Sequence, residues 1–410
     1  MSDEMFALIF VHLSVIILMG LRPVCKAFRD LIDSQYFTYI HLRHSMTNRS
    51  NRIILCRSTD PDRRSVGLYC VDIDTLRCFV PKCPRGRNNS STKLIGTCNG
   101  VVLLFDRVFV EITFWNPAIR TYIDVTLPCV SLPQSYFIDN YRPTLGFGYD
   151  HVNADYKVVM VVHPAGAGSN SKKNDEEVHI YSLKSNSWRR IGNFPSSVNC
   201  RGDSAVCVNG ALYWKCLEKT VNSRTRHIIV AFDLATEEYR VVPTPVYDHP
   251  SWDVDIYIGS IEASLWVQCS LFHTDPEIVE DFVQMVDTWL LVPRNGEEDT
   301  WTKLISFNRP SEFYQPLAYS KSGNQLLLGS EEMFMWYDLV KEEVQEEFKI
   351  RGLPEEYVSE VFVESLVHLH GGAGDVENQL IQEKKVEDDE SDRGLQLLSS
   401  MAMKILEGAV

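Results

Sequence analysis

The feature that most constrains the fold is an eight-residue phrase that recurs along the chain. Each copy starts with an apolar or aromatic residue, continues through a small polar residue and a turn-like stretch, and ends with another large residue. This pattern indicates a hairpin whose first and eighth residues belong to neighbouring strands. The copies are WNPAIRTY (115–122), YSLKSNSW (181–188), FDLATEEY (232–239) and YDLVKEEV (337–344), with a weaker copy VDIDTLRC (71–78).

The spacing of the copies predicts a β-propeller. A stretched copy runs from Trp289 to Trp301 around an NGEED insertion, which makes six phrases over residues 50–369. Repeats of about 40–50 residues that contain several short strands are typical of propeller blades. We therefore expect a mainly β fold with about six blades. The late run EVFVESLVHL (360–369) is predicted to pair into the first blade and close the ring.

The N-terminal segment, residues 1–45, is expected to be helical and to contain two or three helices. So few helices cannot bury all their apolar side chains alone, so we expect the segment to pack on the next domain or to bind a partner. An apolar helix face is indicated by residues that recur at three- and four-residue steps, namely Leu21, Val24, Cys25, Phe28, Leu31 and Ile32. Pro23 is expected just inside this helix.

The C-terminal segment, residues 370–410, changes character again. It combines a GGAGD linker with the charge run EKKVEDDESDR (383–393). Such a composition favours a mostly disordered acidic tail. A partner-binding helix over the weakly amphipathic residues 395–408 is the alternative.

Charge and cysteine usage restrict the class of protein. The net charge is −15 and the basic residues are scattered, which argues against a nucleic-acid surface. The apolar run 5–21 follows Asp3 and Glu4 and is shorter than the roughly 20 residues that span a bilayer, so we expect no membrane segment. The 11 cysteines form no C-x-x-C pair. We expect no zinc site, and buried reduced thiols in a cytoplasmic or nuclear protein.

No catalytic constellation stands out in the sequence. GFGYD (146–150) lacks the third glycine of a dinucleotide site, and the loop 164–173 lacks the order of a phosphate loop. His368 and His370 stand two residues apart without an apparent third metal ligand. We therefore expect a non-catalytic chain without cofactor or metal. A helical docking unit followed by a repeat β scaffold suits an adaptor.

Two sets of motifs resemble a known family. Residues 3–42 resemble an F-box, and the repeats resemble the plant F-box-associated domain. The latter resemblance rests on G-x-C-N-G (96–100), W-N-P-A-x-R (115–120), G-F-G-Y-D (146–150) with Y-K-V-V (156–159), V-x-I-Y-S-L-K-S-N-S-W-R (178–189), V-N-G-x-L-Y-W (208–214) and F-D-L (232–234). The F-box match departs from its usual pattern at Ser14, at Ile16 or Ile17, and at Phe28.

The resemblance implies the substrate-recognition subunit of an SCF-type (SKP adaptor–cullin–F-box) ubiquitin ligase. The F-box would dock a SKP-family adaptor, and through it cullin and RING subunits, while the propeller-like domain would hold an unknown protein target. The residues implied in adaptor binding are Leu13, Val15, Leu18, Leu21, Val24, Cys25, Lys26, Phe28, Leu31 and Ile32.

Two other functions remain open at this point. The departures in the F-box are consistent with an interaction or decoy protein that has lost ligase docking. An enzyme on a β-propeller would need convergent acids or a metal at the ring axis. For a target-binding surface, the first candidates are the long loop 165–177 and the turns 133–143 and 246–255, because insertions on one face of a repeat protein often bind.

Overall fold

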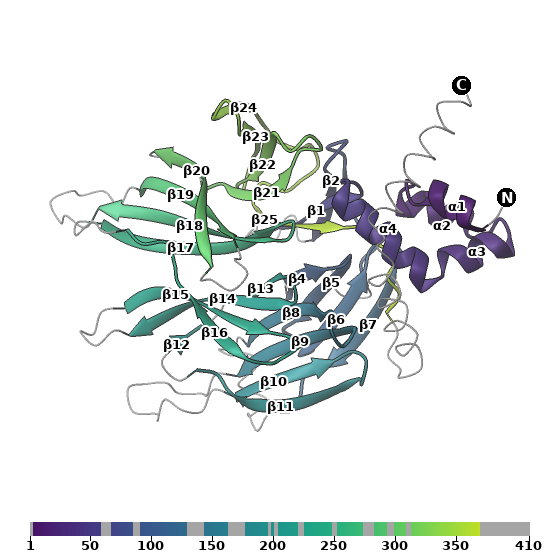
Figure 1. Ribbon diagram of the computed structural model, residues 1–410, viewed down its shortest axis with the longest axis horizontal. Coiled ribbons are helices and arrows are strands. Elements are labelled where there is room, and N and C mark those ends of the chain that lie inside the picture. The colour runs from purple at the N-terminus through teal and green to yellow at the C-terminus, as the bar shows by residue number, and fades with distance from the viewer. Residues whose placement is uncertain are drawn as a thin grey trace.

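The computed structural model describes residues 3–58, 67–84, 91–128, 143–162, 177–195, 198–200, 204–219, 225–247, 252–273, 283–292, 299–308 and 313–369. Within these ranges the chain forms four helices and then 25 strands, and the strands make six antiparallel sheets (Figure 1). Five sheets have four strands and one has five. The predicted mainly β fold with six propeller blades is confirmed.

The blades follow one another along the chain, except that the last strand completes the first blade. Blade 1 contains β25 (Tyr357–Val363), β1 (Arg52–Ser58), β2 (Leu68–Asp72) and β3 (Cys78–Phe79), and blade 2 contains β4 (Thr92–Cys98), β5 (Val101–Asp106), β6 (Glu111–Asn116) and β7 (Thr121–Thr126). Blade 3 contains β8 (Thr144–Asp150), β9 (Asp155–Val162), β10 (Glu177–Ser182) and β11 (Ser187–Asn193). Blade 4 contains β12 (Val198–Asn199), β13 (Val206–Val208), β14 (Ala211–Lys219), β15 (Thr225–Asp233) and β16 (Tyr239–Val242). Blade 5 contains β17 (Trp252–Ile261), β18 (Ser264–His273), β19 (Val283–Val292) and β20 (Thr300–Asn308), and blade 6 contains β21 (Gln315–Tyr319), β22 (Gln325–Gly329), β23 (Phe334–Asp338) and β24 (Glu343–Phe348).

The ring closes through β25, as predicted. This strand pairs with β1 over its whole length, with Val363 opposite Arg52 and Tyr357 opposite Ser58. The strand was expected over residues 360–369, but it spans Tyr357–Val363. Residues 364–369 leave the sheet and pass toward the helices. Closure covers the edge of β1, which would otherwise present unpaired backbone groups.

The hydrophobic core is divided among the seams between blades. The first strand of each blade lies nearest the centre, and β25, β4, β8, β13, β17 and β21 each contact the next around the ring. Apolar side chains fill each of the six seams. Between blades 2 and 3, for example, the rings of Phe114 and Phe147 meet edge to face at 5.7 Å.

The recurring phrase is the outer hairpin of five blades. In every one of these copies the first and eighth residues face each other across the two strands. The pairs are Val71 with Cys78, Trp115 with Tyr122, Tyr181 with Trp188, Phe232 with Tyr239, and Tyr337 with Val344. The predicted hairpins are therefore confirmed at the level of strand register.

The second and sixth residues of the phrase shape its turn. The second is Asp, Asn or Ser, and its side-chain oxygen accepts backbone N–H groups of the turn, as when Asp233 Oδ1 accepts from Ala235 and Thr236 at 2.8 Å. The sixth residue has a left-handed φ between 47° and 61° in all five copies, at Leu76, Arg120, Asn186, Glu237 and Glu342. Its positive φ turns the chain back into the next strand.

The stretched copy in blade 5 does not obey this register, and its expected pairing is wrong. Trp289 faces Lys303, whereas Trp301 faces Leu291, and the register shifts beside Trp289. Strands β19 and β20 both extend past the point where the other hairpins turn. Because the two strands continue to pair beyond Trp289 as far as Val292 and Thr300, Trp289 and Trp301 do not face each other.

The cysteines depart in part from the expectation of buried reduced thiols. Cys200 and Cys216 form a disulfide, with Cα atoms 4.3 Å apart, because the pairing of β12 with β14 continues into this position. Cys56, Cys70 and Cys269 are free and buried as expected. Free thiols at Cys98 and Cys207 are instead partly exposed, and Cys25 is exposed.

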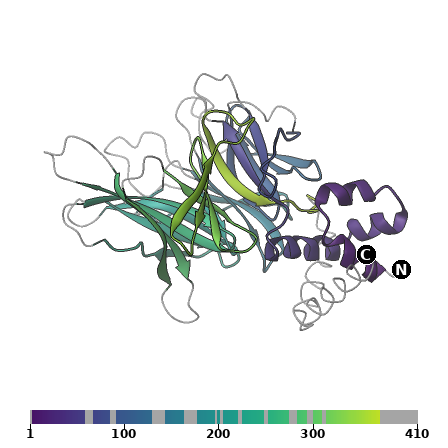
Figure 2. The same ribbon diagram turned by 90° about the horizontal axis from the view of Figure 1, so that it is seen from above.

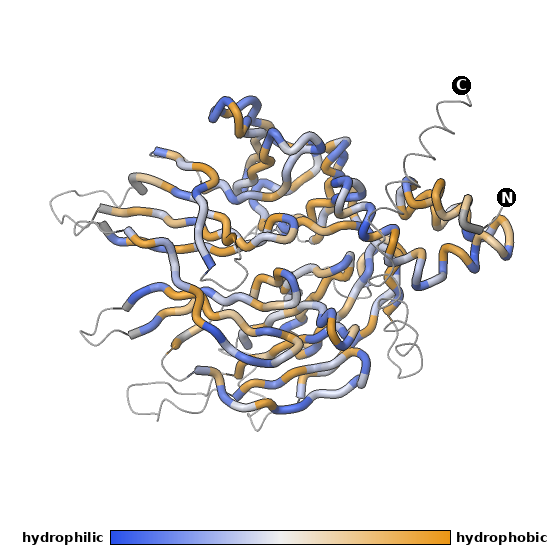
Figure 3. The backbone as a smooth tube through the Cα atoms, in the orientation of Figure 1, coloured by the Kyte–Doolittle hydropathy of each residue, from blue (hydrophilic) through white to orange (hydrophobic). Residues whose placement is uncertain are grey.

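The helices stand at one side of the ring. They are α1 (Asp3–Phe10), α2 (Val15–Leu21), α3 (Lys26–Ile32) and α4 (Gln35–Thr47), more than the two or three expected. Figure 2 shows them projecting from the propeller, with α4 leading back to β1. We call residues 3–47 the helical unit. Most residues of α1 and α2 are hydrophobic, as their orange colour in Figure 3 shows.

Candidate functional site

Helices α2 and α3 are separate, which corrects one expectation from the sequence. Helix α2 ends at Leu21 and α3 begins at Lys26, so the expected single apolar face from Leu21 to Ile32 does not form. Pro23 lies in the connection and not inside α3. It has no N–H with which to continue the hydrogen-bond ladder of α2, so the helix stops before it.

Side-chain caps fix the ends of α3 and the start of α4. The Cys25 sulfur accepts the backbone N–H of Phe28 at 3.4 Å, and the Ser34 hydroxyl accepts that of Phe37 at 3.1 Å. Cys25 is exposed, so its expected place on an apolar face is wrong. Arg22 and Asp33 clamp the two ends of α3 through two bonds of 2.6 and 2.7 Å, which lower the pKa of Asp33.

The ten residues implied in adaptor binding fall into three groups by exposure. Val15, Leu18 and Ile32 are at most 1% exposed and form the core of the helical unit. Leu13, Leu21, Phe28 and Leu31 are partly buried around that core, and Val24, Cys25 and Lys26 are exposed. The buried three support the shape of the unit and do not reach its surface.

Four exposed apolar side chains of α1 and α2 were not among the residues predicted to bind the adaptor, and only Val24 of the surface defined below was. Helix α2 reads VIILMGL, and a helix that is apolar all round buries only the side that faces the core. Ile16 is 74% exposed and Ile17 is 49% exposed. Together with three others they make what we call the helical apolar surface, which consists of Met5, Ile9, Ile16, Ile17 and Val24.

The helical unit is seated on the propeller by apolar contacts. Ile119, from the outer hairpin of blade 2, and Leu366, just after β25, belong to the same core cluster as Val15, Leu18 and Phe37. Leu366 is 1% exposed. The core of the helical unit is thus completed by two residues of the propeller region.

Two of the sequence motifs hold the segment that carries Leu366. From the W-N-P-A-x-R motif, the Asn116 amide donates to the carbonyls of Ser365 and Val367 at 3.0 and 2.9 Å. Next to it, the Ser365 hydroxyl donates to the carbonyl of Asn99 at 2.7 Å. Gly100 of the G-x-C-N-G motif has φ 79°, and a Cβ there would lie 2.7 Å from the Val363 carbonyl oxygen.

A second contact ties the end of the helical unit to the far side of the ring. Arg49, two residues after α4, pairs with Glu262 of blade 5 at 2.6 Å. Its guanidinium also lies over the ring of Tyr319 in blade 6, at 5.3 Å from the centroid. The segment between α4 and β1 therefore contacts blades 5 and 6 through Arg49, and α4 itself contacts β25 of blade 1.

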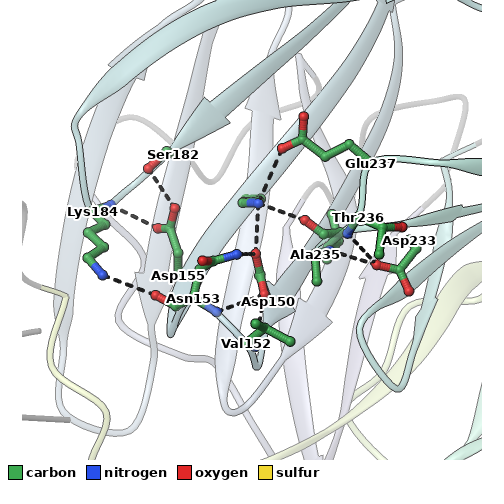
Figure 4. Close-up of polar contacts among 12 residues, drawn as sticks. Asp150, Val152, Asn153, Asp155, Ser182, Lys184, Asp233, Ala235, Thr236 and Glu237 are labelled. Atoms are coloured by element: carbon green, nitrogen blue, oxygen red, sulfur yellow. Dashed lines mark hydrogen bonds and ion pairs between the residues drawn. The ribbon is translucent and has the colours of Figure 1, made fainter. Parts of the chain in front are cut away.

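The G-F-G-Y-D, Y-K-V-V and F-D-L motifs meet in a structural network (Figure 4). Lys157 pairs with Asp150 at 2.7 Å and donates to the carbonyl of Leu234 at 2.6 Å. Glu237 pairs with Lys157 and with Arg189. Because Lys157 and Asp150 are nearly inaccessible, the network joins blade 3 to the outer hairpin of blade 4 and offers no open reactive group.

The segments expected to hold a target connect strand ends opposite the helical unit. The helices meet the β6–β7 hairpin, and because neighbouring strands are antiparallel, the ends of β7, β9 and β16 lie at the other face. Residues 165–176, 133–142 and 248–251 of these segments lie outside the described residues. So do residues 370–410 of the expected tail, together with His370.

The described ranges show no site with the chemistry of an enzyme centre. They hold no group of three His, Cys, Asp or Glu side chains able to bind a metal ion. Near the axis, Glu360 accepts the N–H of Thr97 at 3.0 Å, and burial raises the pKa of its carboxyl to about 7. Asp255 is engaged by Lys215 and His227.

None of the helices in the described part of the chain has both the length and the apolar character needed to cross a bilayer.

Comparison with known proteins gives a consistent picture. A family model described as the F-box associated beta propeller domain matches residues 76–369. The chain is 27% identical to F-box protein CPR1 of Arabidopsis thaliana, over 90% of this chain and 89% of that protein. It is 26% identical to F-box protein At4g22390 of the same plant, over 80% and 81%. A chain in the crystal structure of a nidogen/laminin complex covers 76% of this chain and 98% of its own, at 11% identity and a TM-score of 0.40.

Proposed function

This chain belongs to the F-box-associated β-propeller family, and on that premise we propose that it is the substrate-recognition subunit of an SCF-type ubiquitin ligase. Residues 1–45 act as the F-box, residues 50–369 recognise the target, and residues 370–410 form an acidic tail. The chain itself carries no ubiquitin-transfer chemistry and needs no cofactor. It works in the cytoplasm or nucleus.

The observation that carries this proposal is the helical apolar surface. Five large apolar side chains, on α1, on α2 and in the connection between α2 and α3, stay exposed in the presence of the propeller. Exposed apolar groups of this kind mark protein contacts. We assign the surface to a SKP-family adaptor, through which cullin and RING subunits join.

The seat of the helical unit supports the second half of the proposal. The core contacts of Leu366 and Ile119 and the hydrogen bonds of Asn116 hold the helices against one face of the ring. The ends of β7, β9 and β16 lie at the opposite face, away from the helices. A fixed geometry of this kind holds a target protein at a set place relative to the ubiquitin-conjugating enzyme.

The test is co-purification of the full chain with a SKP-family adaptor. We expect Ile16→Asp and Val24→Asp to abolish the complex, since each buries a charge at the interface. Leu18→Asp is not used, because Leu18 is fully buried and the change would unfold the helices. The matched control is Val108→Asp, which alters a valine that is 70% exposed in blade 2, in the β5–β6 turn.

The results separate this function from its alternative. If the unaltered chain captures no adaptor while it remains folded, the proposal fails and an interaction or decoy protein without ligase docking takes its place. The burial of Val15, Leu18 and Ile32, which leaves fewer contact residues, favours that alternative. If Val108→Asp disrupts the complex as strongly as Ile16→Asp, the assignment of the helical apolar surface is wrong.

A further inference from the structure

The register of two strands in blade 4 brings Cys200 and Cys216 directly opposite each other. The pairing of β12 with β14 puts Asn199 opposite Leu217, so the next pair in this register is Cys200 with Cys216. Their Cα atoms are 4.3 Å apart, close to the spacing of about 4.5 Å of residues that face each other in an antiparallel pair without exchanging backbone hydrogen bonds. Side chains at such positions are the closest neighbours across a sheet. The disulfide between them therefore follows from the strand register.

Two other buried cysteines on paired strands show what the register excludes. In the pairing of β1 with β2, Cys56 faces Tyr69 and Cys70 faces Leu55. The two thiols are one position out of register and lie on opposite faces of the sheet. They belong to different seams, since Cys56 packs between blades 6 and 1 and Cys70 between blades 1 and 2. Burial on neighbouring strands alone does not allow a disulfide, whereas direct opposition does.

The segment that carries Cys200 is held to its own blade over a short distance. Strand β12 is two residues long and pairs with the end of β14 through these two positions. The Thr144 hydroxyl donates to the Cys200 carbonyl at 2.8 Å, but Thr144 belongs to β8 of blade 3. In contrast, β14 pairs with β15 over its whole length. Cleavage of the disulfide would thus leave β14 in place and free residues 198–200 to separate from it.

Both cysteines are closed off from solvent while they are bridged. Cys200 is 2% exposed and Cys216 is 1% exposed, in the apolar seam that also contains Phe194, Val198 and Trp214. Exchange requires a thiolate to reach one of the bridged sulfurs. A reductant therefore gains access when residues 198–200 move off β14. Opening of a short segment of this kind costs much less free energy than global unfolding.

The disulfide lies on the side of the ring that faces away from the helices. Asn209, in the turn between β13 and β14, donates to the carbonyl of Ala263 at 3.0 Å. Next to Ala263, Glu262 pairs with Arg49 of the segment that follows the helical unit. Strand β14 runs away from this turn, so Cys216 lies toward the opposite face. A change at the disulfide therefore reaches the side of the ring proposed above for the target.

We propose that Cys200 and Cys216 form a redox latch, in which a dithiol reductant opens the disulfide and releases residues 198–200 from β14. The inference rests on the proposed function for its cytoplasmic or nuclear location, where thiols are kept reduced and disulfides are mostly transient and redox-sensing or catalytic. One thiolate of the reductant attacks a bridged sulfur, the S–S bond breaks, and the released cysteine takes a proton. The second thiol of the reductant then attacks the mixed disulfide and frees the other cysteine. Two electrons and two protons pass to the cysteines, and the reductant leaves as a disulfide; exchange with an oxidised dithiol is the reverse.

The first experiment uses the folded full chain without denaturant, treated with either oxidised glutathione or an excess of dithiothreitol. Free thiols are blocked with N-ethylmaleimide, and the tryptic digest is analysed without further reduction. Cys200 lies in the peptide 191–201 and Cys216 in 216–219, and neither contains another cysteine. We expect these two peptides to be linked after oxidation and separate after dithiothreitol. The matched control is the pair of peptides 53–57 and 65–77, which carry Cys56 and Cys70 and should never be linked to each other.

Hydrogen exchange of the two redox forms tests the release of the segment. A disulfide that closes a loop of about 15 residues shifts an opening equilibrium by roughly 100-fold. We therefore expect the amides of residues 198–200 to exchange about 10- to 100-fold faster in the reduced chain, with β9 and β10 unchanged. The double variant Cys200→Ser with Cys216→Ser should exchange like the reduced chain under both conditions. Cys56→Ser, which removes a buried thiol outside the latch, should keep the difference between the two forms.

Three results would each overturn the redox latch. The first is that oxidation does not link 191–201 to 216–219. The second is that the link survives excess dithiothreitol until the chain is unfolded, which would make the disulfide a permanent structural one. The third is that both redox forms exchange alike at residues 198–200. These measurements need no adaptor, so a chain that captures the adaptor but shows one of these results keeps the proposed function and loses only the latch.

Discussion

Asn116 and Ser365 lie 249 residues apart in the chain, and the Asn116 amide donates a 3.0 Å hydrogen bond to the Ser365 carbonyl. Asn116 is also the second residue of the hairpin phrase in blade 2, and its Oδ1 accepts the N–H of Ala118. The second residue of each other copy likewise accepts a backbone N–H of its own turn. The corresponding residues are Asp72, Ser182, Asp233 and Asp338, none of which has an amide to donate. One side chain therefore shapes a turn and holds the segment that seats the helices.

Asn116→Asp separates these two roles. The carboxylate still accepts the turn N–H, but it faces the carbonyls of Ser365 and Val367 without a donor in a fully buried position. We expect a loss of about 3 kcal/mol or more in the free energy of unfolding, measured in urea. The matched control is Asp338→Asn, which keeps the cap of an exposed turn and should cost less than about 1 kcal/mol. Equal losses in the two variants would contradict the dual role.

Leu366→Ala should loosen the helical unit more than the ring. Leu366 is buried among residues of α1, α2 and α4, and a buried leucine truncated to alanine costs about 2–5 kcal/mol. Hydrogen exchange read by mass spectrometry should show faster exchange in α2 and α4, with the strands of blade 4 unchanged. Leu328→Ala, in the seam of blades 5 and 6, is the control and should not act selectively on the helices. Unchanged exchange in α2 and α4 would show that the seat does not stabilise them.

Glu342→Gly should stabilise the outer hairpin of blade 6. Glu342 is exposed and has φ 56°, a conformation that costs an ordinary residue about 1–2 kcal/mol and glycine very little. We expect a gain of about 0.5–1 kcal/mol after the greater freedom of glycine in the unfolded chain is subtracted. Lys341→Gly, one residue earlier and without a positive φ, should destabilise instead. Matching signs for the two variants would refute the explanation.

Glu360 should make stability depend on pH in a defined direction. Burial raises the pKa of its carboxyl from 4.5 to about 7, although the bonds from Thr97 oppose this. The folded state therefore holds the proton more tightly than the unfolded state. Its contribution to stability is full below about pH 4.5 and is lost as the pH rises to about 7.

The comparison of Glu360→Gln with the unaltered chain isolates that contribution. The substituted amide is not ionisable, so its free energy of unfolding does not fall with this titration. Relative to the unaltered chain, the free energy of unfolding of the variant should rise by about 1–2 kcal/mol between pH 5 and pH 8, a range that allows for the partial exposure of the site. The measurement is urea unfolding at both values. Glu343→Gln, at an exposed position, should show no such gain.

Local sequence predicted the features that depend on neighbours in the chain. The one-to-eight pairing of the hairpins follows from residues that are seven positions apart, and it held in five blades. The failure at Trp289 arose where longer strands displaced the turn. What the sequence did not reveal depends on distant contacts. The division of the helical residues into buried Leu18 and exposed Ile16 is set partly by Leu366, which no local pattern connects to them.

Closure of the ring by β25 has a consequence during protein synthesis. Every blade from the second to the sixth has its strands before β25 leaves the ribosome, yet β1 keeps an open edge and the helices lack Leu366 until then. A nascent chain released before Val363 would expose both, and exposed strand edges and apolar helices lead to aggregation. We expect a chain truncated after Gly352 to be captured by chaperones and the full chain to escape them, as ribosome-release assays would measure. Synthesis of the last strand and of Leu366 therefore removes both aggregation-prone features at once, because it closes the ring and completes the core of the helical unit.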